Sequence, residues 1–292
     1  MISIIVCSVN SKLAESFRAN VASTIGVEYE LIVQDNRGTT MGICEVYNMC
    51  AERAKYDSLL FIHEDVIFET EGWGREIVEQ LRQPKCGAIG FAGATLKSKS
   101  YSGWGQQRKY SVCNYIEQYV DGSRRHLYTN DSTSAQFQPV VTLDGVALFV
   151  SRKVWAESRF DDQLLRHFHC YDLDFTLQLF DRGYTNYVCK CISIVHFSLG
   201  KYDDAWIRET NKLHDQKWGD KLPMMVGDLS SREIRANERH VDFVYVKSMV
   251  KNLKDRRLAK SLLQGFVKRY GVSNGALIIL LKYLCYRTPN TL

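Results

Sequence analysis

Three short segments of the chain carry side chains that could bind a divalent cation or transfer a proton. His63–Asp65 follows an apolar stretch, and its imidazole and carboxylate groups could together coordinate a divalent metal. Asp172 and Asp174 stand at the start of a helical pattern, where a carboxylate can cap the helix or act as a general base. His196 ends another apolar stretch. Residue type alone leaves a structural and a chemical interpretation open for each segment.

The elements before these segments alternate between two patterns. Short β-branched stretches predict strands, and apolar residues at helical spacing predict helices. The predicted strands are Ile2–Val9, Tyr29–Gln34, Ser58–His63 and Ala88–Ala92, and the predicted helices are Ser11–Ile25, Met41–Lys55 and Trp73–Arg82. This order predicts an α/β fold with an open, mostly parallel sheet flanked by helices. Ligands of such sheets bind beyond the carboxyl ends of the strands, where Asp35 and Glu64-Asp65 are expected.

The rest of the chain is less regular. Lys97–Gln138 is rich in Ser, Tyr and Gly, and we expect loops with short hairpins there, which would form a lid on the acceptor side. Further predicted elements are a strand within Val140–Val150, helices at Ser151–Glu157 and Cys170–Arg182, and one strand at Thr185–Val195. The chain beyond Met224 is expected to be helical, which predicts two domains, residues 1–223 and a basic helical extension at residues 224–292.

Charge is distributed unevenly along the 292 residues. Residues 247–292 hold ten Lys or Arg and one acid, which gives this segment a net charge of +9. Because the whole chain has a net charge of +5, the remaining residues carry a net charge of −4. This favours either an anionic partner or a solvated helical face. No motif that reads nucleic-acid bases accompanies the tail, so we expect no nucleic-acid partner.

The tail also contains the apolar stretch Gly275–Tyr286, which has about half of the ~20 residues that span a bilayer. It is expected to pack on the protein, to form a homo-oligomer, or to support peripheral membrane contact through residues 247–286. Nine cysteines and no recognisable secretion leader predict free thiols and a cytoplasmic protein, on the inner face of the membrane if the tail binds lipid.

In chain order, the segments match a known family. The chain resembles the family 2-like glycosyltransferases, particularly the group named for a streptomycin-biosynthesis protein, over roughly residues 1–220. The matching residues are Ile2–Val6, Tyr29–Asn36, Tyr47-Asn48, Phe61–Val66, Leu143–Gly145, Phe168–Asp174, His196–Gly200 and Lys217-Trp218. The resemblance implies the Rossmann-like GT-A fold.

The resemblance also implies roles for the donor side of the site. The family binds the nucleobase and ribose near Ser8, Asn10 and Asp35, with Asn48 close to the nucleotide. His63-Glu64-Asp65 takes the place of the acidic metal motif, with Asp65 as the main ligand, His63 or Glu64 assisting, and His196 as an additional ligand. The expected cofactor is Mn²⁺ or Mg²⁺.

On the acceptor side, the resemblance implies that Asp172 is the catalytic base and Asp174 a supporting acid. Asp144-Gly145 would line the sugar site, and Trp218 would stack on a sugar ring as an exposed aromatic. The expected reaction is inverting, from a nucleotide-diphosphate donor, with UDP favoured, to a hydroxyl of a glycan or lipid-linked acceptor in cell-surface glycan synthesis.

The sequence departs from the commoner family pattern at several positions. His63 replaces the first Asp of the metal motif, Asn36 replaces a second Asp, and Tyr171 stands where a Glu usually precedes the base. Gln216–Trp218 is similar to, but shorter than, the motif of processive enzymes, so we expect single additions. The departures keep open a catalytically degenerate domain that binds sugar nucleotides or glycans. A nucleotidyltransferase is disfavoured because Ser8–Ala14 lacks glycine.

Overall fold

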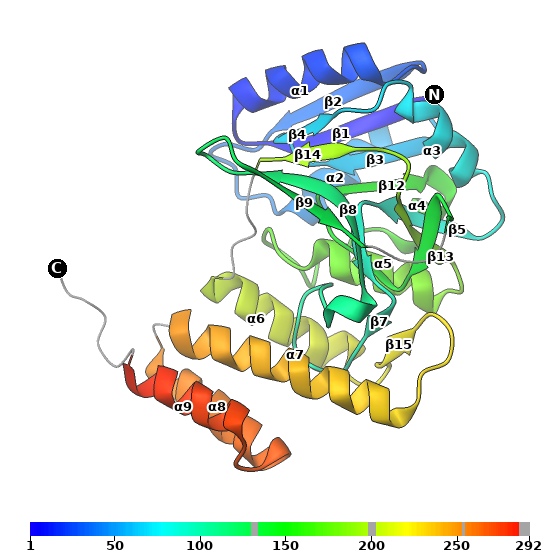
Figure 1. Ribbon diagram of the computed structural model, residues 1–292. Coiled ribbons are helices and arrows are strands. Elements are labelled where there is room, and N and C mark those ends of the chain that lie inside the picture. Colours follow the sequence, from blue (N-terminus) through cyan, green and yellow to red (C-terminus); the bar gives the residue numbers. More distant parts are fainter. Residues whose placement is uncertain (130–133, 198–202, 253–254, 286–292) are drawn as a thin grey trace.

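The computed structural model describes residues 1–129, 134–197, 203–252 and 255–285 (Figure 1). The quoted motif residues Ser198–Gly200 lie outside this part of the chain, as do residues 130–133 of the expected lid.

A seven-stranded sheet forms the centre of the molecule. Its strand order is β10–β13–β5–β12–β3–β1–β2. The strands are β1 (Ile2–Ser8), β2 (Tyr29–Asp35), β3 (Ser58–Ile62), β5 (Cys86–Gly90), β10 (Phe137–Val140), β12 (Ala147–Ser151) and β13 (Thr185–Cys189). The pairs β1–β2, β1–β3 and β13–β5 are parallel, whereas β12 is antiparallel to both of its neighbours and β10 to β13. The sheet is therefore mixed, because β12 enters it in the reverse direction.

Helices cover both faces of this sheet, as the alternating pattern predicts. α1 (Ser11–Thr24) and α3 (Trp73–Leu81) lie on one face, and α2 (Ile43–Arg53), α4 (Arg152–Ser158) and α5 (Tyr171–Asp181) on the other. Neighbouring residues of β1 face opposite clusters: Ile4 packs with Phe17 and Trp73, whereas Ile5 packs with Tyr47 and Phe175. This explains why β1 is buried on both faces and mostly apolar instead of alternating.

A second sheet lies beside the first and corrects two expectations. Its strand order is β11–β6–β8–β14–β4, and β9 pairs with β8. The strands are β4 (Val66–Phe68), β6 (Ala92–Ala94), β8 (Ser111–Gln118), β9 (Arg124–Tyr128), β11 (Thr142–Leu143) and β14 (Ile194–His196). The predicted single strand Thr185–Val195 is wrong, because β13 and β14 belong to different sheets. The Lys97–Gln138 segment is also more regular than expected, since β8 pairs with three strands.

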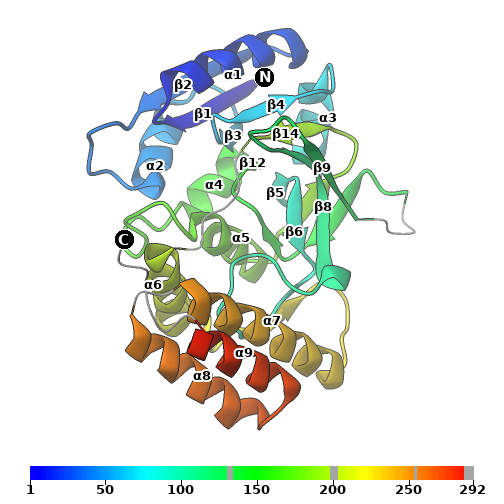
Figure 2. The ribbon, with the colours of Figure 1, turned by 60° about the vertical axis from the view of Figure 1, so that its left-hand side comes forward.

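The C-terminal helices form a unit with its own apolar core, below the sheets in Figure 1. α7 (Ser231–Asn252), α8 (Arg256–Tyr270) and α9 (Asn274–Cys285) pack together and against α6 (Asp204–Leu213), and Figure 2 shows α6 between them and the sheets. A π-helical turn, η2 (His214–Trp218), follows α6. A short ribbon of β15 (Met224–Met225) and β7 (Leu96–Lys97) and the 3-10 turn η1 (Arg108–Tyr110) complete the fold. In the described ranges, no helix has the length and apolar character needed to cross a membrane.

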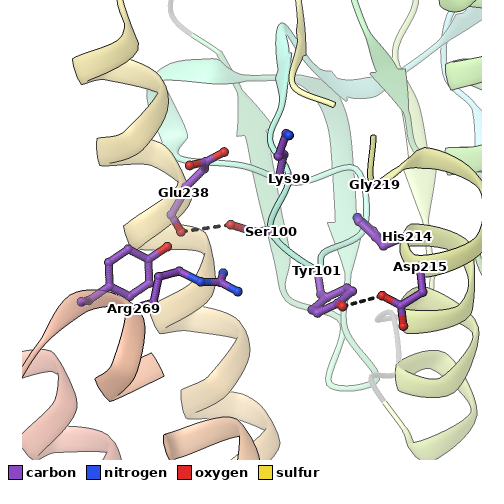
Figure 3. A pocket seen from close by; sticks show the side chains of 9 residues that line it. Lys99, Ser100, Tyr101, His214, Asp215, Gly219, Glu238 and Arg269 are labelled. Atoms are coloured by element: carbon purple, nitrogen blue, oxygen red, sulfur yellow. Dashed lines mark hydrogen bonds between the residues drawn. The ribbon is translucent and has the colours of Figure 1, made fainter. Parts of the chain in front are cut away.

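Buried polar contacts connect η2 to β7 and the loop that follows it. The Lys97 ammonium group donates to the carbonyl oxygens of Ser98 and Ser100 and lies 2.8 Å from His214 Nε2. Burial lowers the pKa of Lys97 to about 7. A cavity of about 300 Å³ lies beside this contact, between α7, α8 and η2 (Figure 3). The cavity lining includes Tyr101 and Arg269 but none of the predicted site residues.

Candidate metal and sugar-transfer site

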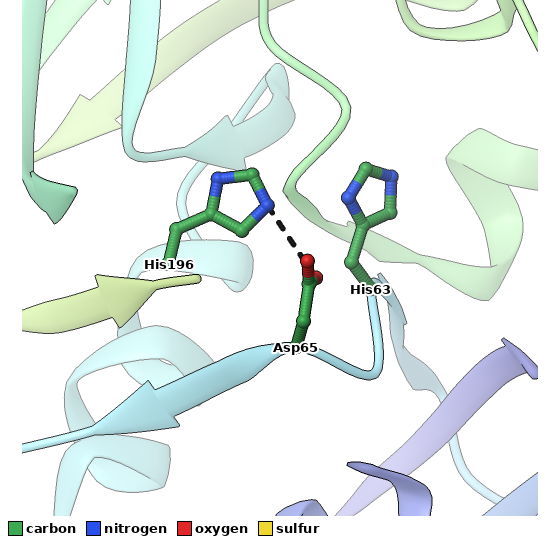
Figure 4. A group of neighbouring side chains, drawn as sticks. All are labelled: His63, Asp65 and His196. Atoms are coloured by element: carbon green, nitrogen blue, oxygen red, sulfur yellow. Dashed lines mark ion pairs between the residues drawn. The ribbon is translucent and has the colours of Figure 1, made fainter. Parts of the chain in front are cut away.

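Three potential metal ligands meet where the chain passes from one sheet to the other. His63 and Asp65 belong to the turn between β3 and β4, and β4 pairs with β14 so that Val66 lies opposite His196. The Asp65 carbonyl oxygen also accepts a hydrogen bond from the backbone N–H of Phe197. This pairing brings His196 Nε2 to 3.4 Å from Asp65 Oδ1, and the ligand atoms of all three residues lie within 4.8 Å of one another (Figure 4).

The surroundings of this cluster favour metal binding over a simple ion pair. The side chains of His196 and Asp65 are only 12% and 15% exposed. Burial, followed by the neighbouring His196, lowers the pKa of His63. A neutral imidazole keeps the lone pair that a metal requires. Two imidazoles and a carboxylate thus form a donor set that fits a divalent cation.

Glu64 points away from these ligands and supports the loop between β1 and α1. Its carboxylate accepts hydrogen bonds from the Ser8 hydroxyl and from the backbone N–H groups of Val9 and Asn10. The Asn10 side chain caps α1 by accepting from the N–H groups of Lys12 and Leu13. Ser8, Asn10 and Glu64 are therefore brought together, with Glu64 holding the loop rather than joining the metal cluster.

Two other residues predicted to bind the nucleotide lie in different environments. Asp35 ends β2 and is exposed, and its bidentate contact with Arg37 lowers its pKa to about 2. Asn48 is buried in α2, where its amide donates to the Phe160 carbonyl oxygen and to the Asp162 carboxylate. Asn48 also accepts a hydrogen bond from the N–H of Phe160, so its amide connects α2 to the chain after α4. These contacts give no support to the expectation that Asn48 lies close to the nucleotide.

Asp172 has the properties that a general base requires. It lies in the first turn of α5, and its Oδ2 accepts a 3.0 Å hydrogen bond from the Gly145 N–H. Burial, followed by the nearby Asp144 carboxylate, raises the pKa of Asp172 to about 7. Asp144 in turn accepts hydrogen bonds from the Trp104 indole and the Val146 N–H. The structure thus brings together Asp144, Gly145 and Asp172.

Asp174 is part of the core instead. It is 1% exposed and accepts hydrogen bonds from Lys217 Nζ at 2.9 Å, Trp218 Nε1 at 2.8 Å and Gln178 Nε2 at 2.9 Å. Trp218 is 2% exposed, which contradicts the expectation of an exposed aromatic. A ring this buried cannot stack on a sugar without moving, so its indole serves to anchor η2 to α5.

Three residues at the site were not assigned a role from the sequence. The Tyr171 hydroxyl lies 2.9 Å from His63 Nε2 and donates to the Gly145 carbonyl oxygen. The Phe168 ring is 53% exposed and lies 5.7 Å from the His63 ring. Trp104 reaches Asp144 from the predicted lid segment. Tyr171 beside Asp172 and Phe168 at the start of the matching segment Phe168–Asp174 were available sequence signals, whereas nothing in the sequence marks Trp104.

Solved structures share this architecture at low sequence identity. GalNAc-T7 with UDP, GalNAc and Mn²⁺ matches with a TM-score of 0.54 at 9% identity over 96% of this chain, which spans only 56% of that protein. Pyrobaculum calidifontis mannosyltransferase PcManGT, in complex with GDP-Man and Mn²⁺, gives a TM-score of 0.52 at 12% identity, covering 98% of this chain and 80% of the other. S. aureus TarS 1–349 in complex with UDP-GlcNAc gives a TM-score of 0.56 at 12% identity, covering 98% of this chain and 91% of the other. These matches confirm the predicted GT-A fold.

The sequence itself gives the more specific result. No curated protein matches it. The family model described as "Glycosyltransferase like family" matches residues 3–221, which include every predicted site residue. The chain therefore belongs to this glycosyltransferase-like family and has the GT-A fold.

Proposed function

We propose that this protein is an inverting, metal-dependent glycosyltransferase that moves a sugar from a nucleotide-diphosphate donor to an acceptor hydroxyl. The observation that carries the proposal is the pairing of two groups of side chains. His63, Asp65 and His196 form a cation-binding set, and Tyr171 connects that set directly to the helix turn that carries Asp172. A cation set and a base are the two parts that direct displacement from a diphosphate requires.

The donor set bears on the choice of cation. Mg²⁺ prefers oxygen ligands, whereas this cluster offers two imidazole nitrogens and one carboxylate. We therefore propose Mn²⁺ rather than Mg²⁺, and two of the solved relatives contain Mn²⁺. When bound, the cation would act as a Lewis acid and neutralise charge on the departing diphosphate.

Asp172 performs the proton transfer in this proposal. Its carboxylate removes the proton from the acceptor hydroxyl while that oxygen attacks the anomeric carbon from the side opposite the leaving group. The Gly145 N–H holds the carboxylate in position. Because the pKa of Asp172 is about 7, it is both basic enough to accept a proton and largely ionised slightly above neutral pH.

The remaining parts of the site are assigned by position. Asp35 and the Ser8–Asn10 loop, which Glu64 supports, are proposed to contact the nucleotide. UDP is favoured because two of the three solved relatives bind UDP or a UDP-sugar. The exposed Phe168 ring, in place of Trp218, is proposed to pack against a sugar. We also propose that the chain falls in the streptomycin-biosynthesis-type subgroup, since it carries that group's ordered motifs.

Calorimetric titration of UDP with and without Mn²⁺ tests the proposal. We expect UDP binding that depends on Mn²⁺ and is lost in Asp65→Ala. It should persist in Asp228→Ala, which removes an exposed acid in the connection before α7. Absence of binding in the unmodified protein would overturn the proposal for UDP donors. Normal binding with no sugar transfer to any acceptor would favour the degenerate binding domain instead.

The C-terminal helices suggest where an acceptor resides. α9 buries Ala276 and Ile279 against α7 and α8 but exposes an apolar row in the opposite direction, formed by Leu277 (48%), Ile278 (44%), Leu280 (40%), Leu281 (61%) and Leu284 (44%). The neighbouring helix α8 exposes the basic side chains of Arg257, Lys260 and Lys268, whereas Arg269 pairs with Asp242 of α7. An exposed apolar row on one helix and exposed basic side chains on the adjacent helix are features that suit an anionic bilayer surface.

We propose that residues 224–292 form an appended unit that docks on anionic membrane and brings the enzyme to a lipid-linked acceptor. The full chain should float with vesicles that contain phosphatidylglycerol and float less with neutral vesicles. Leu277→Ser combined with Leu281→Ser should abolish flotation, while Val120→Ser, at an exposed site outside this unit, should not. If the double variant instead converts a dimer to a monomer in sedimentation and floats normally, the row is a contact between copies of the chain.

A further inference from the structure

The Tyr171 hydroxyl occupies a position between the cation-binding set and the acceptor side of the site. Tyr171 is the first residue of α5 and is 4% exposed. Its oxygen lies 2.9 Å from His63 Nε2 and 2.8 Å from the Gly145 carbonyl oxygen. A phenol has only one hydrogen to donate, so these two contacts cannot both be donations from Tyr171.

The direction of each hydrogen bond follows from the partners. The Gly145 carbonyl oxygen can only accept, so the phenol hydrogen points to it. The phenol oxygen must then accept from His63, which requires the hydrogen of the imidazole to be on Nε2. In a neutral imidazole the other nitrogen, Nδ1, then carries the lone pair. Figure 4 shows that the ring nitrogen beside Cγ of His63 lies on the side of Asp65 and His196.

Gly145 makes this arrangement sterically possible. A Cβ atom at position 145 would lie 2.2 Å from the Tyr171 hydroxyl oxygen, a distance that no side chain could tolerate. The same residue donates its N–H to Asp172. A single residue, Gly145, therefore contacts both the proposed base and the tyrosine that bonds the proposed metal ligand.

We propose that Tyr171 is a positioning residue that fixes His63 in the Nε2–H tautomer and so directs the Nδ1 lone pair toward the bound cation. This inference rests on the proposed function. Metal-bound histidines commonly donate their second N–H to a neighbouring acceptor, and loss of that acceptor weakens metal affinity about 10–100-fold. Here the acceptor of the His63 N–H is the phenol of Tyr171, because the sequence has Tyr instead of the expected Glu at position 171.

The variant Tyr171→Phe tests this role, with Tyr47→Phe as the matched control. Tyr47 belongs to the same buried aromatic cluster, 5.7 Å from the Tyr171 ring, and its hydroxyl neighbours that of Tyr171 but makes no hydrogen bond to His63 or Gly145 among the described residues. Long-range proton–nitrogen NMR spectra of metal-free protein labelled at histidine, at about pH 8 where an imidazole is neutral, report the tautomer. The His63 signals are those lost in His63→Gln.

We expect the Nε2–H tautomer of His63 in the unmodified protein and in Tyr47→Phe, and a mixture of tautomers in Tyr171→Phe. The Mn²⁺ dissociation constant, measured by electron paramagnetic resonance with UDP present, should rise about 10–100-fold in Tyr171→Phe alone. An Nδ1–H tautomer in the unmodified protein, or unchanged Mn²⁺ affinity in Tyr171→Phe, would overturn the inference. If no protein binds Mn²⁺, the proposed function fails, and the metal-positioning role fails with it. The NMR spectra then still show whether Tyr171 sets the tautomer.

Discussion

The two sides of the first turn of α5 place the same chemical group in opposite circumstances. On the side facing Gly145, the Asp172 carboxylate accepts from backbone N–H groups that include Gly145, and burial, followed by the neighbouring Asp144 carboxylate, raises its pKa to about 7. On the core side, Asp174 is 1% exposed and accepts from Lys217 and Trp218. Burial raises the pKa of Asp174 as well, but the donors Lys217 and Trp218 oppose that shift and tie the carboxylate to η2, so its main contribution is to stability. Substitutions on the two sides should therefore separate activity from stability.

The largest expected effect is on the side of Asp172. Asp172→Asn should lower the turnover number about 10²–10⁴-fold, because the amide cannot take the proton of the acceptor hydroxyl. UDP affinity and the free energy of unfolding should change little. Transfer assays with single-turnover kinetics measure the first effect, and calorimetry measures the second. Transfer at the normal rate would show that Asp172 is not the base.

The Asp174→Asn variant should instead have a lower free energy of unfolding than the unmodified protein. Removing one partner of a buried ion pair costs up to about 3–5 kcal/mol, and we expect about 3 kcal/mol here because Lys217 keeps its pair with Asp161. Urea unfolding followed by circular dichroism measures this cost. The control is Asp181→Asn in the same helix, whose pair with Lys221 is more exposed and is worth about 0–1 kcal/mol. Equal losses in both variants would contradict the comparison.

A smaller effect is expected for Trp218→Phe. The variant keeps a buried ring but loses the N–H that donates to Asp174, and a hydrogen bond to a charged group contributes about 1.5–3 kcal/mol. The midpoint of urea unfolding should fall while the Michaelis constant for the sugar donor stays the same. A raised Michaelis constant without loss of stability would restore Trp218 as a sugar contact.

The smallest effect is expected in the pH dependence of the transfer rate. A carboxyl group with a raised pKa is protonated below that value, so the basic form of Asp172 accumulates as pH rises through about 7. kcat/KM should therefore increase over this range and then level off. Asp144→Asn removes a neighbouring negative charge and should move the profile to lower pH. A profile that Asp144→Asn leaves in place would show that another group controls the rate.

Much of the fold follows from local patterns in the sequence. Strands such as Ile2–Ser8 and helices such as Trp73–Leu81 were predicted within one or two residues, because the first is a short β-branched run and the second has apolar residues at helical spacing. The break between β13 and β14 was missed because the connection Lys190–Ser193 contains no Gly or Pro. The direction of β12 was missed because strand pairing depends on contacts distant in sequence.

The site divides in a similar way. Motif order identified His63, Asp65 and His196, which the structure brings together. The predictions that failed concern residues whose burial cannot be read from local sequence. No local pattern distinguishes an exposed tryptophan from Trp218, which is buried and donates to Asp174 of α5. The same holds for Asn48, whose partners Phe160 and Asp162 lie more than a hundred residues along the chain.

The position of the cation-binding set between two sheets has a consequence for folding. His63 is fixed by its backbone bond to Val146 at the start of β12, and His196 by the pairing of β14 with β4 and β8. Contacts between residues so distant in sequence form late, after the loops between them have closed. In a refolding experiment, the capacity to bind Mn²⁺ should therefore return after most of the secondary structure has formed, and it would report completion of the native topology.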